Sequence, residues 1–181
     1  MAALAVGIMA TPAMAQVPVA QVNQAVDAVL PQVVTWRRHL HQHPELGFAE
    51  TATAEVIADH LRSLGLEVRT GAAKTGVIGI LRGAKPGRTV ALRSDMDALP
   101  VKEATGLPFA STATGQYLGE TVPVAHACGH DAHMAMLMGA ATVLAGMKDQ
   151  ISGTVVFVFQ PAEEGAPPGE PMGGAALMLH E

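Results

Sequence analysis

The sequence has 181 residues, of which 49% are hydrophobic and only 15% are charged, a composition typical of a single globular unit rather than of a disordered or fibrous chain. Its formal net charge of -5 provides no broad basic surface and argues against nucleic acid as a partner. Cys128 is the only cysteine, so a disulfide within the chain is excluded and the thiol is free for other chemistry.

Residues 1–15 form a short apolar run that ends in Ala13-Met14-Ala15, the small-residue spacing that a signal peptidase reads. We therefore predict a signal peptide, with export to the bacterial periplasm or the exterior. Basic residues, which usually precede such a run, are missing. A frayed alanine-rich terminus of a cytoplasmic protein is the alternative. The run is too short to span a bilayer, and the sequence contains no other transmembrane candidate.

Two helical patterns come next along the chain. Apolar residues recur at helical spacing from Val22 to Leu40, with Pro31 as a kink or a new first turn. A second pattern follows Thr51 and ends at Gly65, a residue that commonly terminates helices. We expect two successive helices before the first strand.

The period then changes to that of strands. Short β-branched runs separated by glycine-rich or Lys-Pro-Gly-Arg turns occupy 66–70, 77–83 and 89–95, and a helical pattern covers 131–147. The run TVVFVFQ at 154–160 is an uninterrupted apolar strand of the kind buried on both faces. We predict an α/β fold in which a mixed sheet is layered with helices, followed by an irregular loop at 165–174.

The densest chemical cluster spans residues 126–133, HACGHDAH, and contains one thiol, three imidazoles and one carboxylate just before a helix. A thiolate with imidazole suits zinc and other late first-row ions. Gly129 gives the backbone freedom to turn Cys128 and His130 toward one ion.

Simpler interpretations exist for each residue of this cluster. Cys128 could be an inert buried thiol, Asp131 a helix N-cap, and His126 or His133 ordinary surface histidines. For Asp131 and His133 we favour something close to these structural interpretations. The functional alternative is that each side chain contacts a metal ligand and orients it.

Two further carboxylate pairs follow predicted strands, where α/β folds place their sites. Glu163 and Glu164 follow the apolar strand, and such adjacent carboxylates need a cation or protons to compensate them. One can bind the cation while the other takes a proton, although two solvated glutamates in a turn are the alternative. Asp95 and Asp97 are spaced to emerge on one side of their strand and suit the support of histidine ligands, with an aspartate-rich turn as the alternative.

A fourth cluster, residues 36–50, contains His39, His41 and His43 near a predicted helix end. A spacing of two on a helix does not bring side chains to one point. We therefore interpret this cluster as a helix terminus packed against the site and not as a set of metal ligands.

Taken together, four motifs resemble a known family: H-x-H-P-E-L-G-F-x-E, S-D-M-D-A-L-P, H-A-C-G-H-D-x-H and Q-P-A-E-E-G. They resemble, in this order, those of the aminoacylase, hippurate hydrolase and indoleacetyl-amino-acid hydrolase branch of the dinuclear metallopeptidases, the family that includes glutamate carboxypeptidase. The resemblance covers the chain from about Trp36 to its end. It implies a zinc-peptidase-like catalytic domain with two divalent metals, zinc, manganese, cobalt or nickel, in a complete site.

Carried over by position, the resemblance implies that Cys128, His130 and Glu164 are metal ligands, with Cys128 in the place of a bridging aspartate of more distant relatives. Glu163 falls on the family's general base. Asp97 matches the aspartate that orients a metal-site group, and it joins Glu163 among the expected catalytic residues.

Asp95 occupies a position where relatives outside this branch carry a histidine ligand, so its role stays open together with those of Asp131 and His133. Members of the family continue beyond the Glu-Glu motif with two further histidine ligands and a smaller domain for dimerisation and closure over substrate. Residues 16–181 are therefore expected to be the N-terminal part of the catalytic domain. The full-length form is expected to be a homodimer.

The expected reaction is hydrolysis of the amide bond of an N-acyl amino acid or small peptide-like substrate, with metal-activated water and Glu163 as the base. One alternative is a thiol hydrolase in which Cys128 is the nucleophile and His126 or His130 its base, an arrangement that leaves Glu163 and Glu164 without a task. Another is a metal-binding fragment that lacks activity by itself, which the expected absence of distal ligands favours for the isolated chain.

Overall fold

The computed structural model describes residues 17–181, so the predicted signal peptide at 1–15 lies outside the described residues. The helices are α1 (Val19–Gln42), α2 (Thr51–Ser63), α3 (His130–Gly146) and α4 (Gly174–His180), with a 3-10 turn, η1, at Lys148–Gln150. The strands are β1 (Glu67–Ala72), β2 (Gly76–Arg82), β3 (Lys85–Asp95), β4 (Thr114–Tyr117), β5 (Glu120–Pro123) and β6 (Ser152–Gln160).

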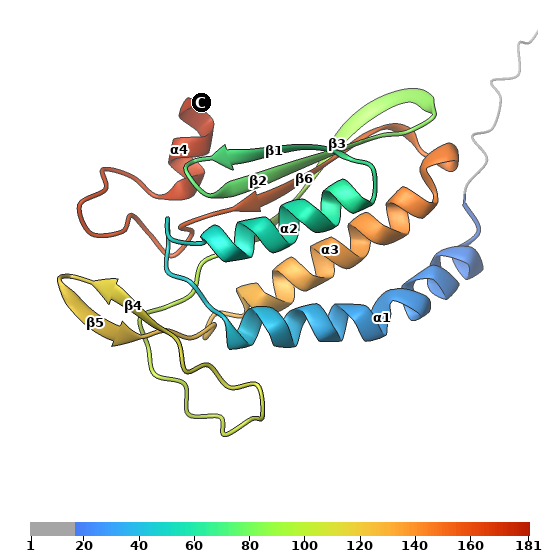
Figure 1. Cartoon of the computed structure of the whole chain (residues 1–181). Coiled ribbons are helices and arrows are strands. Elements are labelled where there is room, and N and C mark those ends of the chain that lie inside the picture. The colour runs from blue at the N-terminus through green and yellow to red at the C-terminus, as the bar shows by residue number, and fades with distance from the viewer. Residues whose placement is uncertain (1–16) are drawn as a thin grey trace, which may run out of the picture.

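The four long strands form one mixed sheet in the order β1-β2-β6-β3 (Figure 1). Strands β1, β2 and β6 pair in antiparallel fashion, whereas β3 runs parallel to β6. Helix α2 packs on β1 and β2, helix α3 packs mainly on β3, and α1 packs against α3 (Figure 1). The predicted α/β fold with a mixed sheet is confirmed.

The core lies between the sheet and helices α2 and α3. Phe157 and Phe159 of β6 are fully buried there, together with Leu61 of α2 and Met138 of α3. Helix α1 approaches α3 closely at Gly139, where an added Cβ would lie 2.6 Å from Val33 Cγ2.

The structure differs from the sequence prediction at three places. Strand β6 is not buried on both faces, because alternate side chains point to opposite faces and Val156 and Val158, on the face away from Phe157, are only partly buried. Residues 114–123 form a two-stranded hairpin, β4 and β5, which was not predicted. The loop expected at 165–174 is irregular up to residue 173, and a short helix that was not predicted, α4, begins at Gly174.

The fold brings the four motifs to one edge of the sheet. Because β3 and β6 are parallel and in register from Thr89–Thr154 to Asp95–Gln160, the segments that follow them emerge side by side. Isolated bridges then join Ala98 to Leu46 of the first motif and Leu99 to Ala125, just before the third motif. None of the helices in residues 17–181 combines the length and apolar composition that a bilayer-spanning segment needs.

Candidate metal centre

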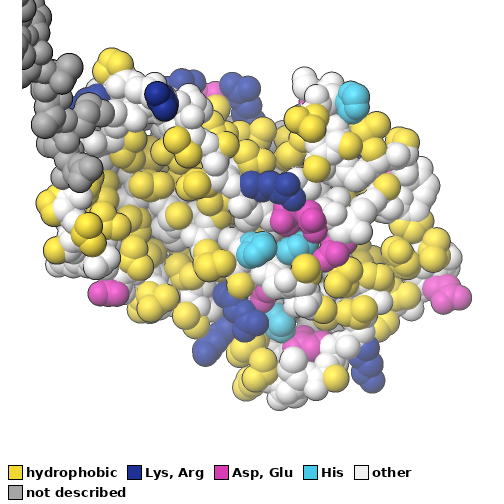
Figure 2. All heavy atoms as spheres, turned by 180° about the vertical axis from the view of Figure 1, so that it is seen from behind, with side chains coloured by type: hydrophobic (Ala, Val, Ile, Leu, Met, Phe, Trp, Pro, Cys, Tyr) yellow, Lys and Arg dark blue, Asp and Glu magenta, His cyan; other side chains and the backbone are white. Residues whose placement is uncertain are grey.

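The residues predicted to bind metal meet at the start of α3. Single ligand atoms of Cys128, His130 and Glu164 all lie within 4.8 Å of one another. Gly129 separates the first two in a left-handed conformation with φ of +91°, which a residue with a Cβ disfavours. Figure 2 shows histidine and acidic side chains gathered near the centre of one face, with hydrophobic side chains around them.

The hydrogen bonds of His130 determine which ring nitrogen faces the centre. Its Nδ1 lies 2.8 Å from the backbone oxygen of Asp97, which can only accept, so Nδ1 carries the proton. The remaining nitrogen, Nε2, lies 3.6 Å from Glu163 Oε2 and 3.9 Å from Glu164 Oε1. Three groups that can each act as an electron donor therefore face one another, an arrangement that fits a bound cation.

A hydrogen bond to the Asp97 side chain, opposed by burial, raises the pKa of His130 to about 9. A metal at Nε2 would compete with a proton, so binding is expected to weaken as the pH falls.

Asp97 holds the two glutamates through their backbone and not through their side chains. Its Oδ1 accepts a hydrogen bond from the Glu163 amide at 3.0 Å, and its Oδ2 accepts one from the Glu164 amide at 3.1 Å. Burial alone would raise the pKa of Asp97, but hydrogen bonds from His130 and these amides lower it. The buried carboxylate is therefore ionised and fixes both the imidazole and the loop that follows β6.

Cys128 is exposed, and its surroundings do not favour a free thiolate. A hydrogen bond with Glu164 and then burial raise the pKa of the thiol. A nucleophilic cysteine needs the opposite shift, whereas a bound metal ion deprotonates a coordinating thiol itself. The described geometry therefore favours a metal ligand over the thiol nucleophile.

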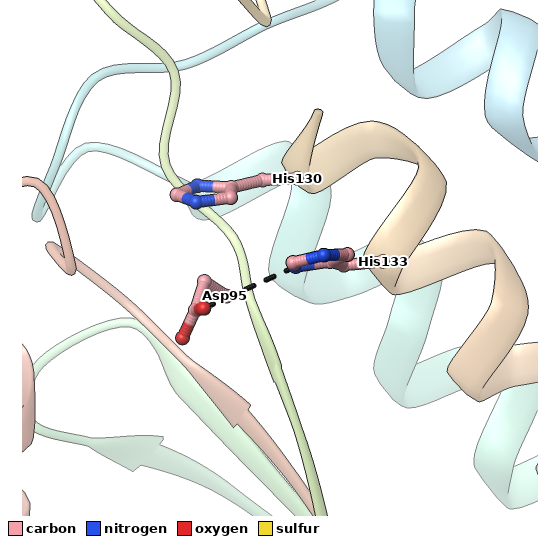
Figure 3. A group of neighbouring side chains, drawn as sticks. All are labelled: Asp95, His130 and His133. Atoms are coloured by element: carbon pink, nitrogen blue, oxygen red, sulfur yellow. Dashed lines mark ion pairs between the residues drawn. The ribbon is translucent and has the colours of Figure 1, made fainter. Parts of the chain in front are cut away.

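A second group of possible ligands comprises Asp95, His130 and His133 (Figure 3) and shares His130 with the first. The His133 ring is stacked on His130 at 5.8 Å between ring centroids, and its Nδ1 lies 4.0 Å from Asp95 Oδ2. However, Arg93 places Nε at 2.8 Å and an Nη at 2.7 Å from the other oxygen of Asp95. Because Arg93 already balances this carboxylate, the group is less suited to a cation than Cys128, His130 and Glu164.

Asp131 does not cap α3, so that interpretation is wrong. Gly129 occupies the N-cap position, while Asp131 Oδ2 lies 2.8 Å from both His41 Nδ1 and Arg37 Nε. The other nitrogen of His41, Nε2, lies 2.9 Å from Glu103 Oε1. Both ring nitrogens of His41 therefore face carboxylates, and this histidine links the first turn of α3 to Glu103.

His39 and His43 lie away from this network, so the three histidines of the cluster at residues 36–50 do not meet at one point, as predicted. His126 is buried and not a surface residue, contrary to the simpler interpretation, and neither ring nitrogen has a hydrogen-bond partner within residues 17–181. Burial lowers the pKa of His126 to about 4. Beside the centre, a hollow of about 120 Å³ borders Asp97 and Glu164.

The sequence reasoning left several supporting residues without a role. His41 and Glu50 are buried and Glu103 is half-buried, and all three form hydrogen bonds with residues far away in sequence. His41 and Glu50 both lie in the first motif, and neither was assigned as a metal ligand. Polar residues of a motif that have no assigned role were therefore the available signal for these two supporting residues.

Several known proteins resemble this chain in both sequence and fold. The model of peptidase family M20/M25/M40 matches residues 91–181. The chain is 48% identical over 148 residues to thermostable carboxypeptidase 1 of Saccharolobus solfataricus, covering 81% of this chain and 35% of the carboxypeptidase. It is 45% identical over 159 residues to the N-acyl-L-amino acid amidohydrolase of Geobacillus stearothermophilus, covering 87% of this chain and 41% of that enzyme.

Among solved structures, the YXEP protein of Bacillus subtilis, a dinuclear metal-binding peptidase of the M20 family, superposes with a TM-score of 0.68 at 41% identity. The superposition covers 76% of this chain and 37% of that one. The chain thus spans between one third and two fifths of the length of these relatives.

Proposed function

The chain belongs to peptidase family M20/M25/M40, and we propose that residues 16–181 contribute the metal centre of an amidohydrolase. Its substrates would be N-acyl amino acids or small peptide-like amides, by analogy with the amidohydrolase and carboxypeptidase relatives. The observation that carries this proposal is the convergence of Cys128, His130 and Glu164, with Glu163 beside them.

In this proposal Cys128 Sγ, His130 Nε2 and a Glu164 oxygen hold a divalent metal, with a second metal in the complete site. The metal would supply Lewis-acid polarisation of the scissile carbonyl and a lower pKa for the attacking water. Asp97 acts as a positioning residue, because it fixes His130 and the backbone of both glutamates.

Glu163 is the proposed general base. Its side chain is 36% exposed, and no described residue donates a hydrogen bond to its carboxylate, so a water molecule can reach it. Glu163 would take a proton from the water that attacks the carbonyl carbon and pass it to the amide nitrogen. The C–N bond then breaks to give a carboxylic acid and a free amine.

Asp95 and His133 would flank the centre, and Asp131 would tie the first turn of α3 to α1. The metal would be zinc, manganese, cobalt or nickel, since all of them accept this mixture of ligands. The complete protein would be a homodimer.

Export is proposed from the apolar run at 1–15. Expression in a bacterium, followed by determination of the first residue of the mature protein, tests it. Cleavage before Gln16 would support export, and an intact terminus in the cytoplasm would contradict it.

The central test is a cobalt titration of the purified chain and of Glu163→Gln, with hydrolysis of an N-acyl amino acid measured in parallel in the full-length form with and without the same substitution. Both forms should bind Co²⁺ with a thiolate-to-cobalt absorption band, and Cys128→Ser should lose that band. Hydrolysis should fall by about 10²- to 10⁴-fold in Glu163→Gln, because the general base is lost.

Two results would contradict the proposal. Binding by both forms without hydrolysis by either would favour a metal-binding chain without activity. Activity that resists chelators and disappears only when Cys128 is alkylated would favour the thiol hydrolase.

A further inference from the structure

Two buried carboxylates hold three consecutive backbone amides at the candidate centre. Glu50 Oε1 accepts a hydrogen bond from the Ala162 amide at 2.9 Å, and Asp97 accepts those of Glu163 and Glu164. Glu50 is fully buried, and its Oε2 accepts a hydrogen bond from the Thr75 hydroxyl at 2.6 Å. The amidohydrolase mechanism proposed above assigns no task to Glu50 or Thr75.

Ala162 has an unusual backbone conformation directly before the glutamate pair. Its φ is +44°, in the left-handed region that residues with a Cβ disfavour. Such a conformation persists only where the surroundings determine it. Ala162 is 1% exposed, its carbonyl accepts a hydrogen bond from the Gly174 amide at 3.0 Å, and Gly47 lies against its Cβ.

The side chains of Glu163 and Glu164 are 36% and 29% exposed and are not fixed by packing. Their directions therefore depend on the backbone from which they project. Asp97 holds that backbone from one side, and Glu50 holds the residue where the chain turns from β6 toward the centre. A shift at Ala162 would move both carboxylates relative to His130.

We infer that Glu50 is a positioning residue for the metal centre: with Thr75, it fixes the left-handed Ala162 and so directs Glu163 and Glu164 toward His130 and Cys128. This inference rests on the proposed function for its consequence, metal binding. Independently of metal binding, the geometry predicts that Glu50 keeps the backbone at residues 162–164 ordered.

The experiment compares Glu50→Ala and Glu50→Gln in the full 181-residue chain. Co²⁺ affinity and amide hydrogen exchange at residues 162–164 are both measured, the latter by NMR. Glu50→Ala should speed exchange at Glu163 and Glu164 at least about tenfold and weaken Co²⁺ binding by about 10- to 100-fold, as expected for groups that orient metal ligands. Glu50→Gln should retain both properties, because its amide can accept from Ala162 and donate to the Thr75 oxygen.

Glu45→Ala is the matched control within the same motif. Glu45 accepts hydrogen bonds from the Ala52 and Thr53 amides at the start of α2 and does not contact Ala162. Its loss should destabilise the chain without changing exchange at Glu163 and Glu164 or Co²⁺ affinity. If Glu50→Ala does not fold, Thr75→Val removes one hydrogen bond of the same arrangement and should give a smaller change in the same direction.

Exchange at Glu163 and Glu164 within about twofold of the original chain in Glu50→Ala would overturn the inference, as would an equal change in Glu45→Ala. Failure of the unmutated chain to bind Co²⁺ would instead overturn the proposed metal centre. The exchange rates would still decide whether Glu50 positions this backbone, so the two failures are distinguishable.

Discussion

The front and the back of the candidate centre use the same kinds of side chain in opposite ways. The front comprises Cys128, Glu163 and Glu164, which are exposed or partly exposed. The back comprises the buried carboxylates of Glu50, Asp97, Glu103 and Asp131, each of which accepts at least two hydrogen bonds or ion pairs.

Desolvation explains the difference. A buried carboxylate must be paired or hydrogen-bonded, or it becomes protonated. Asp97 meets this requirement with backbone amides, and Asp131 meets it with Arg37 and His41. At Glu50 the hydrogen bonds do not outweigh burial, which raises the pKa of this carboxyl group to about 7. The back therefore fixes the chain, and the front keeps its lone pairs free for a cation. Substitutions at the back should lower stability, whereas those at the front should change binding and catalysis.

The largest effect on stability is expected for Asp131→Ala. The substitution leaves Arg37 and the buried His41 without their shared carboxylate, and loss of one partner of such a buried pair costs roughly 3–5 kcal/mol. Urea denaturation measures the change. Asp59→Ala is the control, because its ion pair with Arg62 is exposed and contributes at most about 1 kcal/mol. If both variants lost a similarly small free energy of unfolding, the distinction between the back and the front of the centre would not hold.

The helices and main strands could be predicted because their apolar periods are regular and because the residues around Gly65 carry standard end signals. The hairpin of β4 and β5 could not, since its residues are mostly polar and its strands have only four residues each. The local sequence therefore specifies the helices and main strands, whereas the hairpin of β4 and β5 depends on tertiary contacts.

The candidate site divides in the same way. The front residues could be predicted because thiol, imidazole and adjacent carboxylates in short motifs have few structural uses. The back could not, since each contact joins distant segments: Glu50 to Ala162 across 112 positions, and His41 to Asp131 across 90. Asp131 illustrates the limit, because its place near a helix start predicted a cap while the fold turns it toward α1.

A smaller effect is expected from the pH dependence that Glu50 confers. Burial raises the pKa of Glu50 to about 7 from its ordinary value of 4.5, so the folded chain binds this proton more tightly than the unfolded chain. The resulting contribution to the free energy of unfolding is fully present below about pH 4.5 and is lost as the pH rises through 7. The loss amounts to at most roughly 3 kcal/mol. Glu50→Gln should abolish this part of the change in the free energy of unfolding with pH.

Urea denaturation at pH 5 and pH 8, with a chelator present, measures the difference between Glu50→Gln and the unmutated chain. Glu45→Gln is the control, since this carboxylate caps the exposed start of α2. Equal slopes in the unmutated chain and Glu50→Gln would mean that Glu50 is already ionised in the folded state at pH 5.

The smallest effect on stability is expected for Glu163→Gln, the substitution with the largest expected effect on catalysis. Asp97 holds the backbone amide of Glu163, and that bond does not depend on the side chain. The free energy of unfolding without metal should therefore change by less than about 0.5 kcal/mol. Urea denaturation in a chelator measures it. A loss above about 1 kcal/mol would place the Glu163 carboxylate with the residues that fix the chain, and its role as a freely accessible base would then be untenable.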